Sequence, residues 1–224
     1  MQIEGLIAPG ADDLGTLRKL ADMMGESFLE ENWTRYILNT LPDATDARKL
    51  AISQELLYVD FTSGTQYPVC FATPDLAACA GVYRKSDLGD KNWDEVEDEG
   101  HAKMARDFLT AEEAQVYLDT CEKIAPVSDF GWQPARAAET GYSDYLHMYV
   151  LGVDKNARGT GAFRRLMTPI YAYADEHGLP CYLETYSDDL VSLYEHVGFK
   201  QIKTLSMEGV ELRETLMERL PQGK

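Results

Sequence analysis

The sequence predicts an α/β fold, and three patterns in its 224 residues indicate this class. Residues 145–174 carry a run of aromatic and β-branched residues, a short turn with two glycines, and then one helical apolar face. From residue 143 onward, predicted strands alternate with predicted helices, and the chain closes with two strands. A further pair of strands is predicted within residues 68–84, where Pro74-Asp75 supplies the turn.

Composition and length indicate one large domain. Hydrophobic residues make up 45% of the chain, which is ample for a core, and no internal repeat or low-complexity tract divides it. No stretch approaches the ~20 apolar residues that a membrane-spanning helix needs. No basic region followed by a long apolar run comes after Met1, so we expect no signal peptide and a cytoplasmic protein.

The charge balance narrows the class of partner. The chain has 21 basic and 38 acidic residues, a formal net charge of −17, and this argues against nucleic acid as a ligand. It is compatible with a cationic substrate such as an amine, although plain solubility is the favoured explanation of the charge. The cysteines form no CxxC pair, so we expect reduced thiols and no zinc site; they are Cys70, Cys79, Cys121 and Cys181.

Helical spacing dominates the first quarter of the chain. Leucine and methionine residues recur on one face over residues 13–28, and aromatic and aliphatic residues continue a helical spacing over 33–41 until Pro42. A further helix is predicted for residues 45–61. Ahead of these helices, residues 3–7 predict a short strand that ends at a Pro-Gly turn.

The middle of the chain mixes short elements with an acidic segment. Residues 68–73 and 77–84 predict the strands of a hairpin. Residues 87–99 are rich in Asp and Glu, and we interpret them as a solvated loop or an exposed helical face rather than a metal site. Helices are predicted at 102–109 and 111–124.

A capping box supports the start of the helix at residues 111–124, because Thr110 is followed three residues later by Glu113. Residues 125–143 contain two prolines and two glycines. We predict a connecting loop there.

The last third of the chain predicts the alternating part of the fold. The strand before the glycine turn and the helix after it lead to a Gly-Leu-Pro stop. The remaining predicted elements are a strand at 181–186, a short helix at 189–196, and a hairpin of strands at 199–205 and 210–220.

The turn between strand and helix has the spacing Asn156-x-x-Gly159-x-Gly161. Two glycines let the backbone approach a ligand closely, and a helix start offers unpaired N–H groups that suit a pyrophosphate. The turn is not a dinucleotide fingerprint, because Arg164 occupies the place of the third glycine, and it lacks the Gly-Lys-Ser/Thr of a P-loop.

This turn resembles the acyl-CoA pyrophosphate turn of the GNAT superfamily of N-acyltransferases, with Asn156 where Gln or Arg is usual. Residues 174–185 are similar to a string in the subgroup that includes puromycin N-acetyltransferase. Residues 194–199 match the Tyr-x-x-x-Gly-Phe ending of the superfamily. The resemblance covers residues 143–204, with all three motifs in order.

The resemblance implies a fold and a division of labour along the chain. The fold would be a mixed, mostly antiparallel central sheet with one parallel pair that splays open, and with helices on both faces. We expect a single domain over residues 1–224. In it, residues 1–142 would cover the acceptor, 143–204 would form the acyl-CoA-binding core, and 205–220 would supply the C-terminal strand.

The resemblance also implies acetyl-CoA as co-substrate and no metal. The thioester would enter between the strand that ends near Val153 and the strand that begins near Cys181. Where the superfamily often has Asn, this chain has Leu190, so one hydrogen bond to the pantetheine arm would be missing. The residues expected to hold acetyl-CoA are Leu151, Gly152, Val153, Arg158, Gly159, Thr160, Gly161, Ala162 and Tyr194.

Three residues are candidates for catalysis, and each has a plainer alternative. Tyr194 would be the general acid that protonates the departing thiolate, or it packs its helix on the sheet; the motif favours the acid. Glu184, flanked by tyrosines on its strand face, would be a general base or an orienting hydrogen-bond acceptor. His147 would relay the amine's proton, although a satisfied core histidine is the commoner outcome.

The predicted activity is transfer of an acetyl group to a primary amine by direct attack. Trp33 and Tyr36 would line the acceptor pocket, although packing is the commoner role for either residue taken singly. A small-molecule amine is favoured over a protein terminus because the long first half would cover the site. No nucleic acid or membrane partner is expected, and the chain would be a monomer or homodimer. The alternative is a non-catalytic acyl-CoA-binding or acyl-sensing module.

Overall fold

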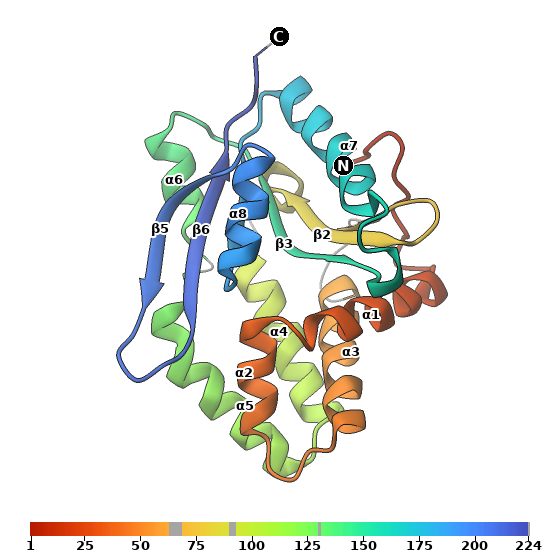
Figure 1. Ribbon diagram of the computed structural model, residues 1–224, viewed down its shortest axis with the longest axis vertical. Helices are drawn as coiled ribbons and strands as arrows, with labels where there is room; N and C mark the ends of the chain where they lie inside the picture. Colours follow the sequence, from red (N-terminus) through yellow and green to blue (C-terminus); the bar gives the residue numbers. More distant parts are fainter. Residues whose placement is uncertain (63–68, 90–92, 130, 224) are drawn as a thin grey trace.

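The computed structural model describes residues 1–62, 69–89, 93–129 and 131–223, and within these residues the strands form one sheet (Figure 1). The order across this six-stranded sheet is β1-β2-β3-β4-β6-β5. Neighbours run antiparallel except for β3 and β4, which are parallel. The strands are β1 (Cys70–Ala72), β2 (Ala78–Arg84), β3 (Leu146–Val153), β4 (Cys181–Thr185), β5 (Lys200–Ser206) and β6 (Arg213–Arg219).

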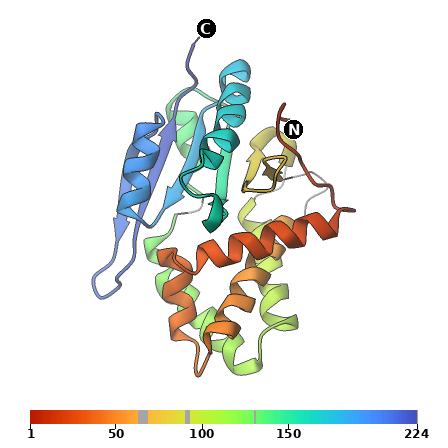
Figure 2. The same ribbon diagram turned by 45° about the vertical axis from the view of Figure 1, so that its right-hand side comes forward.

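Helices cover both faces of the sheet and build a separate lobe below it. In Figures 1 and 2, α7 and α8 lie on one face, α6 lies on the other, and α1 to α5 gather below. The helices are α1 (Leu14–Phe28), α2 (Asn32–Thr40), α3 (Asp46–Thr62), α4 (Trp93–Asp107), α5 (Ala111–Ile124), α6 (Gln133–Glu139), α7 (Ala162–His177) and α8 (Asp188–His196). The mixed α/β class expected from the sequence is confirmed.

Alternation along the central strands separates an apolar face from a polar one. Side chains of successive strand residues point to opposite faces. Leu146 and Met148 therefore join Leu183 in a core packed against α7 and α8. Their neighbours Tyr145 and Tyr182 point to the α6 face and pack with Trp132. His147 and Glu184 belong to this second face, which places both at one side of the sheet.

The parallel pair β3–β4 separates after two paired positions. Over the described length of both strands, the pairs are Leu146↔Cys181 and His147↔Tyr182. Beyond them β3 continues to Val153, held by β2 on its other side. Helix α1 crosses this end of β3 so closely that a Cβ on Gly152 would lie 2.2 Å from the Met24 sulfur. The expected splayed pair is present, and it leaves a gap in the sheet.

A β-bulge changes the direction of β3 just before the gap. The register against β2 shifts between Gly81 and Val82, so that Val150 pairs with Gly81 and Met148 with Val82. Tyr149 is the extra residue, and bulges of this kind bend a strand and redirect its side chains. The Tyr149 ring lies over Gly81, where a Cβ would approach a ring carbon to 2.4 Å. Glycine at position 81 therefore makes room for the ring.

Three expectations about elements are wrong. Residues 3–7 form no strand, because their pairing is an isolated bridge between Ile7 and Ala72. The helix predicted at 102–109 begins at Trp93 in the structure, so part of the acidic segment 87–99 is helical. Residues 90–92 of that segment and the first residue of the predicted strand 68–73 lie outside the described residues.

The third error matters most for function. The predicted loop 125–143 contains the helix α6. Pro134 indicated a loop, but proline fits the first turn of a helix, where the N–H that it lacks has no helical partner. This helix brings two N–H donors, from Trp132 and Gln133, to the face of the sheet on which it packs.

None of the described helices is both long and apolar enough to cross a bilayer. All four cysteines are free thiols, as expected for a chain without a disulfide framework.

Candidate active site

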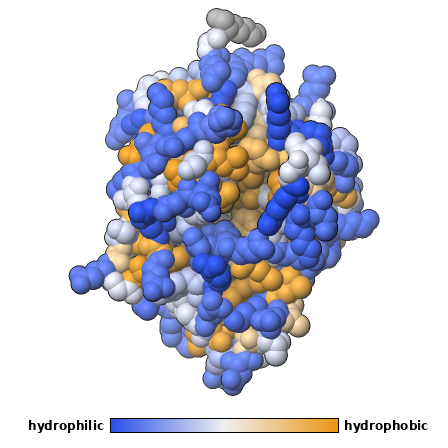
Figure 3. Space-filling model, in the orientation of Figure 1, coloured by the Kyte–Doolittle hydropathy of each residue, from blue (hydrophilic) through white to orange (hydrophobic). Residues whose placement is uncertain are grey.

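A cavity of about 1240 Å³ lies where the sheet splays apart, between the helical lobe and the two central strands. Its walls come from the end of α1, from α2, α3, α4 and α5, from β3 and β4, from the start of α7 and from α8. Figure 3 shows a hollow with apolar side chains on the face that carries α7 and α8. The size and the mixed lining suit an extended ligand and a second, smaller one.

The glycine turn forms an open anion cradle at one end of this cavity. Gly159 and Gly161 have φ values of +77° and +82°, and a Cβ on either would meet nothing within 4 Å. The bond from the Arg165 N–H to the Gly161 carbonyl begins the helical ladder. The N–H groups of residues 162–164 therefore precede the ladder and point toward the turn. Such a helix start fits a pyrophosphate.

Cations surround the cradle. Arg158 contacts Glu30 at 2.8 Å, and both side chains are exposed, so the pair is weak and open to exchange. Arg164 lines the cavity, and no ion pair with it is seen in the described part of the chain. Sequence reasoning considered Arg164 for its departure from a fingerprint and not as a ligand. Thr160 is not a lining residue; its hydroxyl donates to the Ala157 carbonyl and braces the turn.

The end of β3 presents backbone groups to the gap. The Asp154 N–H donates to the Ala77 carbonyl, on the β2 side of the strand. Because peptide groups alternate in direction along a strand, Leu151 and Val153 turn theirs toward the gap. The Ser27 hydroxyl donates to the Val153 carbonyl at 3.0 Å from that side. The N–H and C=O of Leu151 face the space beside β4.

Tyr194 lies on α8 and lines the cavity. It is buried, and its ring packs with Phe163 and Phe199. Burial raises the pKa of its hydroxyl, and the charge of Glu31 adds to the increase. The group therefore holds its proton at neutral pH. Leu190, one turn earlier on α8, also lines the cavity, so an apolar side chain occupies the position where the superfamily often has Asn.

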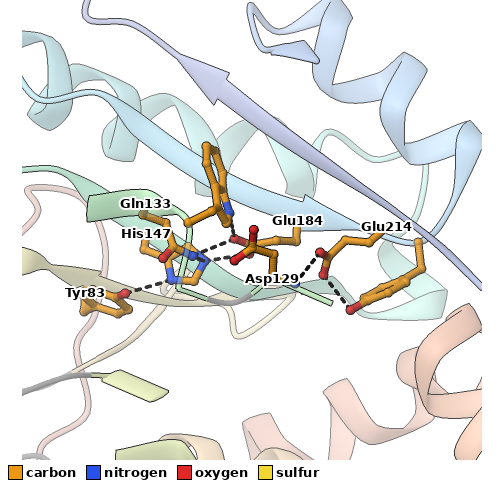
Figure 4. Close-up of polar contacts among 8 residues, drawn as sticks. Tyr83, Asp129, Gln133, His147, Glu184 and Glu214 are labelled. Atoms are coloured by element: carbon orange, nitrogen blue, oxygen red, sulfur yellow. Dashed lines mark hydrogen bonds and ion pairs between the residues drawn. The ribbon is translucent and has the colours of Figure 1, made fainter. Parts of the chain in front are cut away.

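His147 and Glu184 lie next to each other at the base of the cavity, almost fully buried (Figure 4). The Nε2 atom of His147 is 2.7 Å from Glu184 Oε2, and its Nδ1 atom is 3.0 Å from the Tyr83 hydroxyl. The other oxygen of Glu184 accepts from Gln133 Nε2 at 2.7 Å and from the Trp132 indole N–H. Glu184 is thus a fixed carboxylate surrounded by N–H donors.

The two donors from Trp132 and Gln133 were missed, because their segment was predicted to be a loop. A signal was present: Pro134 followed by an alanine-rich run is typical of a helix start. The packing of Trp132 against Tyr182, with ring centroids 5.0 Å apart, anchors this helix on the sheet.

A second carboxylate beside this network was also missed. Glu214 on β6 is fully buried and accepts from the Tyr186 hydroxyl at 2.7 Å and from the Asp129 N–H at 2.8 Å. Burial raises the pKa of Glu214 to about 7, and the negative charge of Glu184 adds to the increase. Ser128 contacts the Tyr186 hydroxyl at 2.7 Å. Tyr186 and Ser128 line the cavity, and Glu214 lies behind them.

The far arm of the cavity runs between α3, α4 and α5. Its apolar walls include Leu56, Leu57 and Ile124, and Asp98 and Glu122 lie at its exposed end. Trp33 lines the cavity as predicted for an acceptor residue. Tyr36 is not among the lining residues; its hydroxyl is 3.4 Å from the Lys123 ammonium nitrogen.

The match to known proteins falls on this part of the molecule. Residues 129–199, from the loop before α6 to the end of α8, match the model of the Acetyltransferase (GNAT) family. Over this segment, which is less than half of the chain, the sequence is similar to that family. The matched residues include the glycine turn and both Glu184 and Tyr194. Glu214 and the α1–α5 lobe lie outside the matched segment.

Curated and solved relatives agree with the family match. An uncharacterized N-acetyltransferase of Schizosaccharomyces pombe is 38% identical over 53 residues, which are 24% of this chain and 22% of that relative. The matched stretch is thus about a fifth of that relative's length.

Three solved structures share the fold. An Aedes aegypti arylalkylamine N-acetyltransferase 2 has a TM-score of 0.56 at 10% identity, covering 97% of this chain and 98% of its own. A Corynebacterium glutamicum protein described as histone acetyltransferase HPA2 and related acetyltransferase has a TM-score of 0.56 at 16% identity, covering 100% and 99%. A mosquito arylalkylamine N-acetyltransferase-like protein has a TM-score of 0.54 at 13% identity, covering 96% and 98%. At these identities the likeness concerns the GNAT fold.

Proposed function

We propose that this GNAT protein is an acetyl-CoA-dependent N-acetyltransferase that acts on the primary amine of a small, cationic molecule with an apolar body. The observation that carries the proposal is the splayed pair β3–β4, which opens next to a glycine cradle and leads to a buried, ordered carboxylate. The family match supports acyl transfer, and the site chemistry supports the amine.

The residues present fit acetyl-CoA. Residues 159–164 would hold its pyrophosphate by backbone N–H groups, with Arg158 and Arg164 as nearby cations. Leu151 would pair with the pantetheine arm through its backbone, and its N–H would polarise the thioester carbonyl. Acetyl-CoA supplies the acetyl group, and the rest of the chemistry falls to the side chains around the gap.

The acceptor would enter through the far arm. Asp98 and Glu122 give its mouth a negative potential, and Leu56, Leu57 and Trp33 offer an apolar wall. A cationic amine with an apolar body would meet the acidic mouth with its charge and the apolar wall with its body. A small molecule fits better than a protein terminus because the α1–α5 lobe encloses the arm.

Within the site, Glu184 would hold the amino group in place. Its oxygens already accept N–H donors from Trp132, Gln133 and His147, which favours an orienting charge over a group that takes up a proton. Both ring nitrogens of His147 have partners, so this histidine positions Glu184. Tyr194, protonated and next to the gap, would give its proton to the departing thiolate.

An amine-panel acetylation screen with thiol detection tests the proposal. Steady release of CoA thiol with any small cationic amine is the expected result. Retained acetyl-CoA with no acetylated product across a broad panel would instead identify a non-catalytic acyl-CoA-binding module. If peptide N-termini alone are acetylated, the small-molecule acceptor is wrong and the acyl-transfer function stands.

A further inference from the structure

The proposed function leaves one chemical step, uptake of the proton that the acceptor amine loses, without an assigned residue. An amine is mostly an ammonium ion at neutral pH, and its nitrogen must lose protons before and during attack on the thioester. Tyr194 can return a single proton to sulfur, so at least one proton has to leave the nitrogen for another acceptor. Three N–H groups already donate to the oxygens of Glu184, so we assign this carboxylate to holding the amine.

The second carboxylate, Glu214, accepts fewer hydrogen bonds than Glu184 does. Glu214 has no exposed surface, and its oxygens are held by one hydroxyl and one backbone N–H. Two carboxylates whose surroundings push their protonation apart are the usual arrangement for dividing a charge role from a proton-transfer role. Figure 4 shows Glu214 on one side of Glu184 and His147 on the other.

Tyr186 connects Glu214 to the cavity. Its hydroxyl is 2.7 Å from Glu214 Oε1 and 2.7 Å from the Ser128 hydroxyl, and both Tyr186 and Ser128 line the cavity wall. A hydroxyl has one donor and two acceptor positions. With its proton on the Glu214 side and Ser128 donating to it, the Tyr186 oxygen keeps one acceptor position for an N–H in the cavity.

We propose that Tyr186 and Glu214 form the relay that takes up the proton of the acceptor amine. The N–H bond breaks as the Tyr186 oxygen takes this proton, and the original Tyr186 hydroxyl proton moves to Glu214 Oε1. Tyr186 is a neutral hydroxyl again, and Glu214 becomes a neutral carboxylic acid. After the products leave, Glu214 returns its proton along the same path to water in the cavity. This proposal rests on the proposed function.

The groups around Glu214 account for its affinity for a proton. Burial is the largest cause of the raised pKa of Glu214, and negative charge from Glu184 on β4 and from Asp129 in the loop before α6 adds to it. Tyr186 is itself held in the protonated form, because burial raises its pKa well above the usual value. On β5 the residue paired with Glu214 is Leu205, and the nearby Lys203 is exposed. With a pKa of about 7, Glu214 is half ionised at neutral pH and can both accept and release a proton.

The test compares Glu214→Gln and Tyr186→Phe with the wild-type protein, using any amine that the wild type acetylates. We expect kcat/KM to fall by about 10²-fold above pH 7 in each variant, the lower end of the usual range for proton transfer. The ratio of wild-type to Glu214→Gln activity should shrink tenfold per pH unit below about pH 7. This ratio cancels the titration of the amine itself. The double variant should lose no more than either single one.

Glu218→Gln is the matched control. Glu218 is also buried on β6 and points to the same face, but it pairs with Arg136 and lies away from Tyr186. Its loss would disturb the strand without touching the relay, so its activity ratio should not change with pH. Infrared spectroscopy of the protein without substrates gives a separate readout. A carboxylic-acid C=O band should disappear as the pH rises through about 7, and Glu214→Gln should lack it.

Failure of this inference can be told from failure of the proposed function. If the wild-type protein acetylates no amine, the proposed function fails first. If it does, and Glu214→Gln or Tyr186→Phe keeps the wild-type pH profile, the relay is wrong. If Glu214→Gln does not fold, Tyr186→Phe and the infrared titration of the wild type decide. Absence of a titrating band near pH 7 then overturns the proposal.

Discussion

At the scale of single residues, the site divides its chemistry by how each group is buried. Glu184 is buried, and N–H donors bond to both of its oxygens. Glu214 is buried with fewer donors, and the missing hydration raises its pKa to about 7. Tyr194 is buried among aromatic rings and keeps its proton. The same physical cause, desolvation by burial, therefore raises the pKa of both Glu214 and Tyr194.

The role of Tyr194 leads to a kinetic prediction. Tyr194→Phe keeps the ring and its packing but removes the proton, so kcat should fall at least roughly tenfold, a barrier increase of about 1.4 kcal/mol. The affinity for acetyl-CoA should change little, because backbone groups of residues 151–162 make most of the expected contacts. Steady-state kinetics with a confirmed amine, calorimetry and a melting curve measure these quantities.

Tyr171→Phe is the control for this prediction, because the Tyr171 hydroxyl is buried, is not hydrogen-bonded within the described structure and is not among the cavity-lining groups. A folded Tyr194→Phe with wild-type kcat would show that water or another side chain protonates the thiolate.

At the scale of elements, two helix starts have different tasks: one is open to a ligand, and the other fixes a helix in place. The start of α7 meets the open glycine turn and offers its N–H groups to an anion. The start of α5 is closed by a capping box between Thr110 and Glu113, and Arg48 from α3 binds the same carboxylate. The first arrangement leaves donors available for a ligand. The second uses them to fix α5 against α3 below the cavity.

Gly161→Glu tests the cradle. The new side chain would extend into the open space at the turn and add negative charge where the pyrophosphate is expected, so acetyl-CoA binding should be abolished in calorimetry. The positive φ of +82° also strains any residue with a Cβ, by roughly 1–2 kcal/mol. Gly209→Glu controls for that strain, since Gly209 has φ +79° and open space in the β5–β6 hairpin. Unchanged acetyl-CoA affinity in Gly161→Glu would refute the assignment.

The α5 cap should make stability depend on acidity. Hydrogen bonds from Arg48 lower the pKa of Glu113 to about 2. A depressed carboxylate pKa stabilises the fold above the unfolded value of 4.5, and the contribution disappears as the pH falls through about 2. The full shift would correspond to about 3 kcal/mol, and solvent screening around the partly exposed Arg48 lowers this contribution.

Denaturant unfolding from pH 7 to pH 2 measures this dependence. The difference in unfolding free energy between wild type and Glu113→Gln should be constant above pH 4.5 and shrink below it. Glu112→Gln, at the neighbouring exposed position, should show no such change. If the difference for Glu113→Gln does not depend on pH, then shape and packing, rather than charge, account for the contribution of the cap to the free energy of unfolding.

At the scale of the whole molecule, the net charge of −17 is used locally as well as for solubility. Asp98 and Glu122 lie at the mouth of the far arm, while Arg164 and Arg158, the latter paired with Glu30, lie beside the cradle at the other end of the cavity. An anionic cofactor and a cationic acceptor would each meet the opposite charge on their own side.

This polarity predicts a salt effect on acceptor binding. For a cationic amine, KM should rise with ionic strength, since the Debye length is already about 8 Å at physiological salt. The variant Asp98→Asn/Glu122→Gln should raise KM about two- to fivefold with kcat unchanged, as expected for exposed charges. The matched control is Glu112→Gln/Glu208→Gln, two exposed acids elsewhere. Equal KM values in both double variants would show that the mouth does not select for charge.

The sequence by itself determined what depends on short stretches. Helical and strand periodicity predicted the α/β class and nearly every element, since these patterns arise from local backbone geometry. The spacing at Asn156, Gly159 and Gly161 indicated the cradle, and the Tyr194 motif indicated the proton donor. His147 and Glu184 were singled out because alternation assigns each strand residue a face.

Tertiary structure decided what depends on pairing between distant segments. Glu214 meets Tyr186 because β6 lies next to β4 in a register that ends at Thr185↔Thr215, one position before them. The donors to Glu184 come from α6, a helix of seven residues whose proline resembled a loop signal. Tyr36 turned toward Lys123 instead of the cavity. Local periodicity carries no information on sheet order or register. The burial of whole faces determines both, and they decide which hydrogen-bond donors surround Glu184 and which surround Glu214.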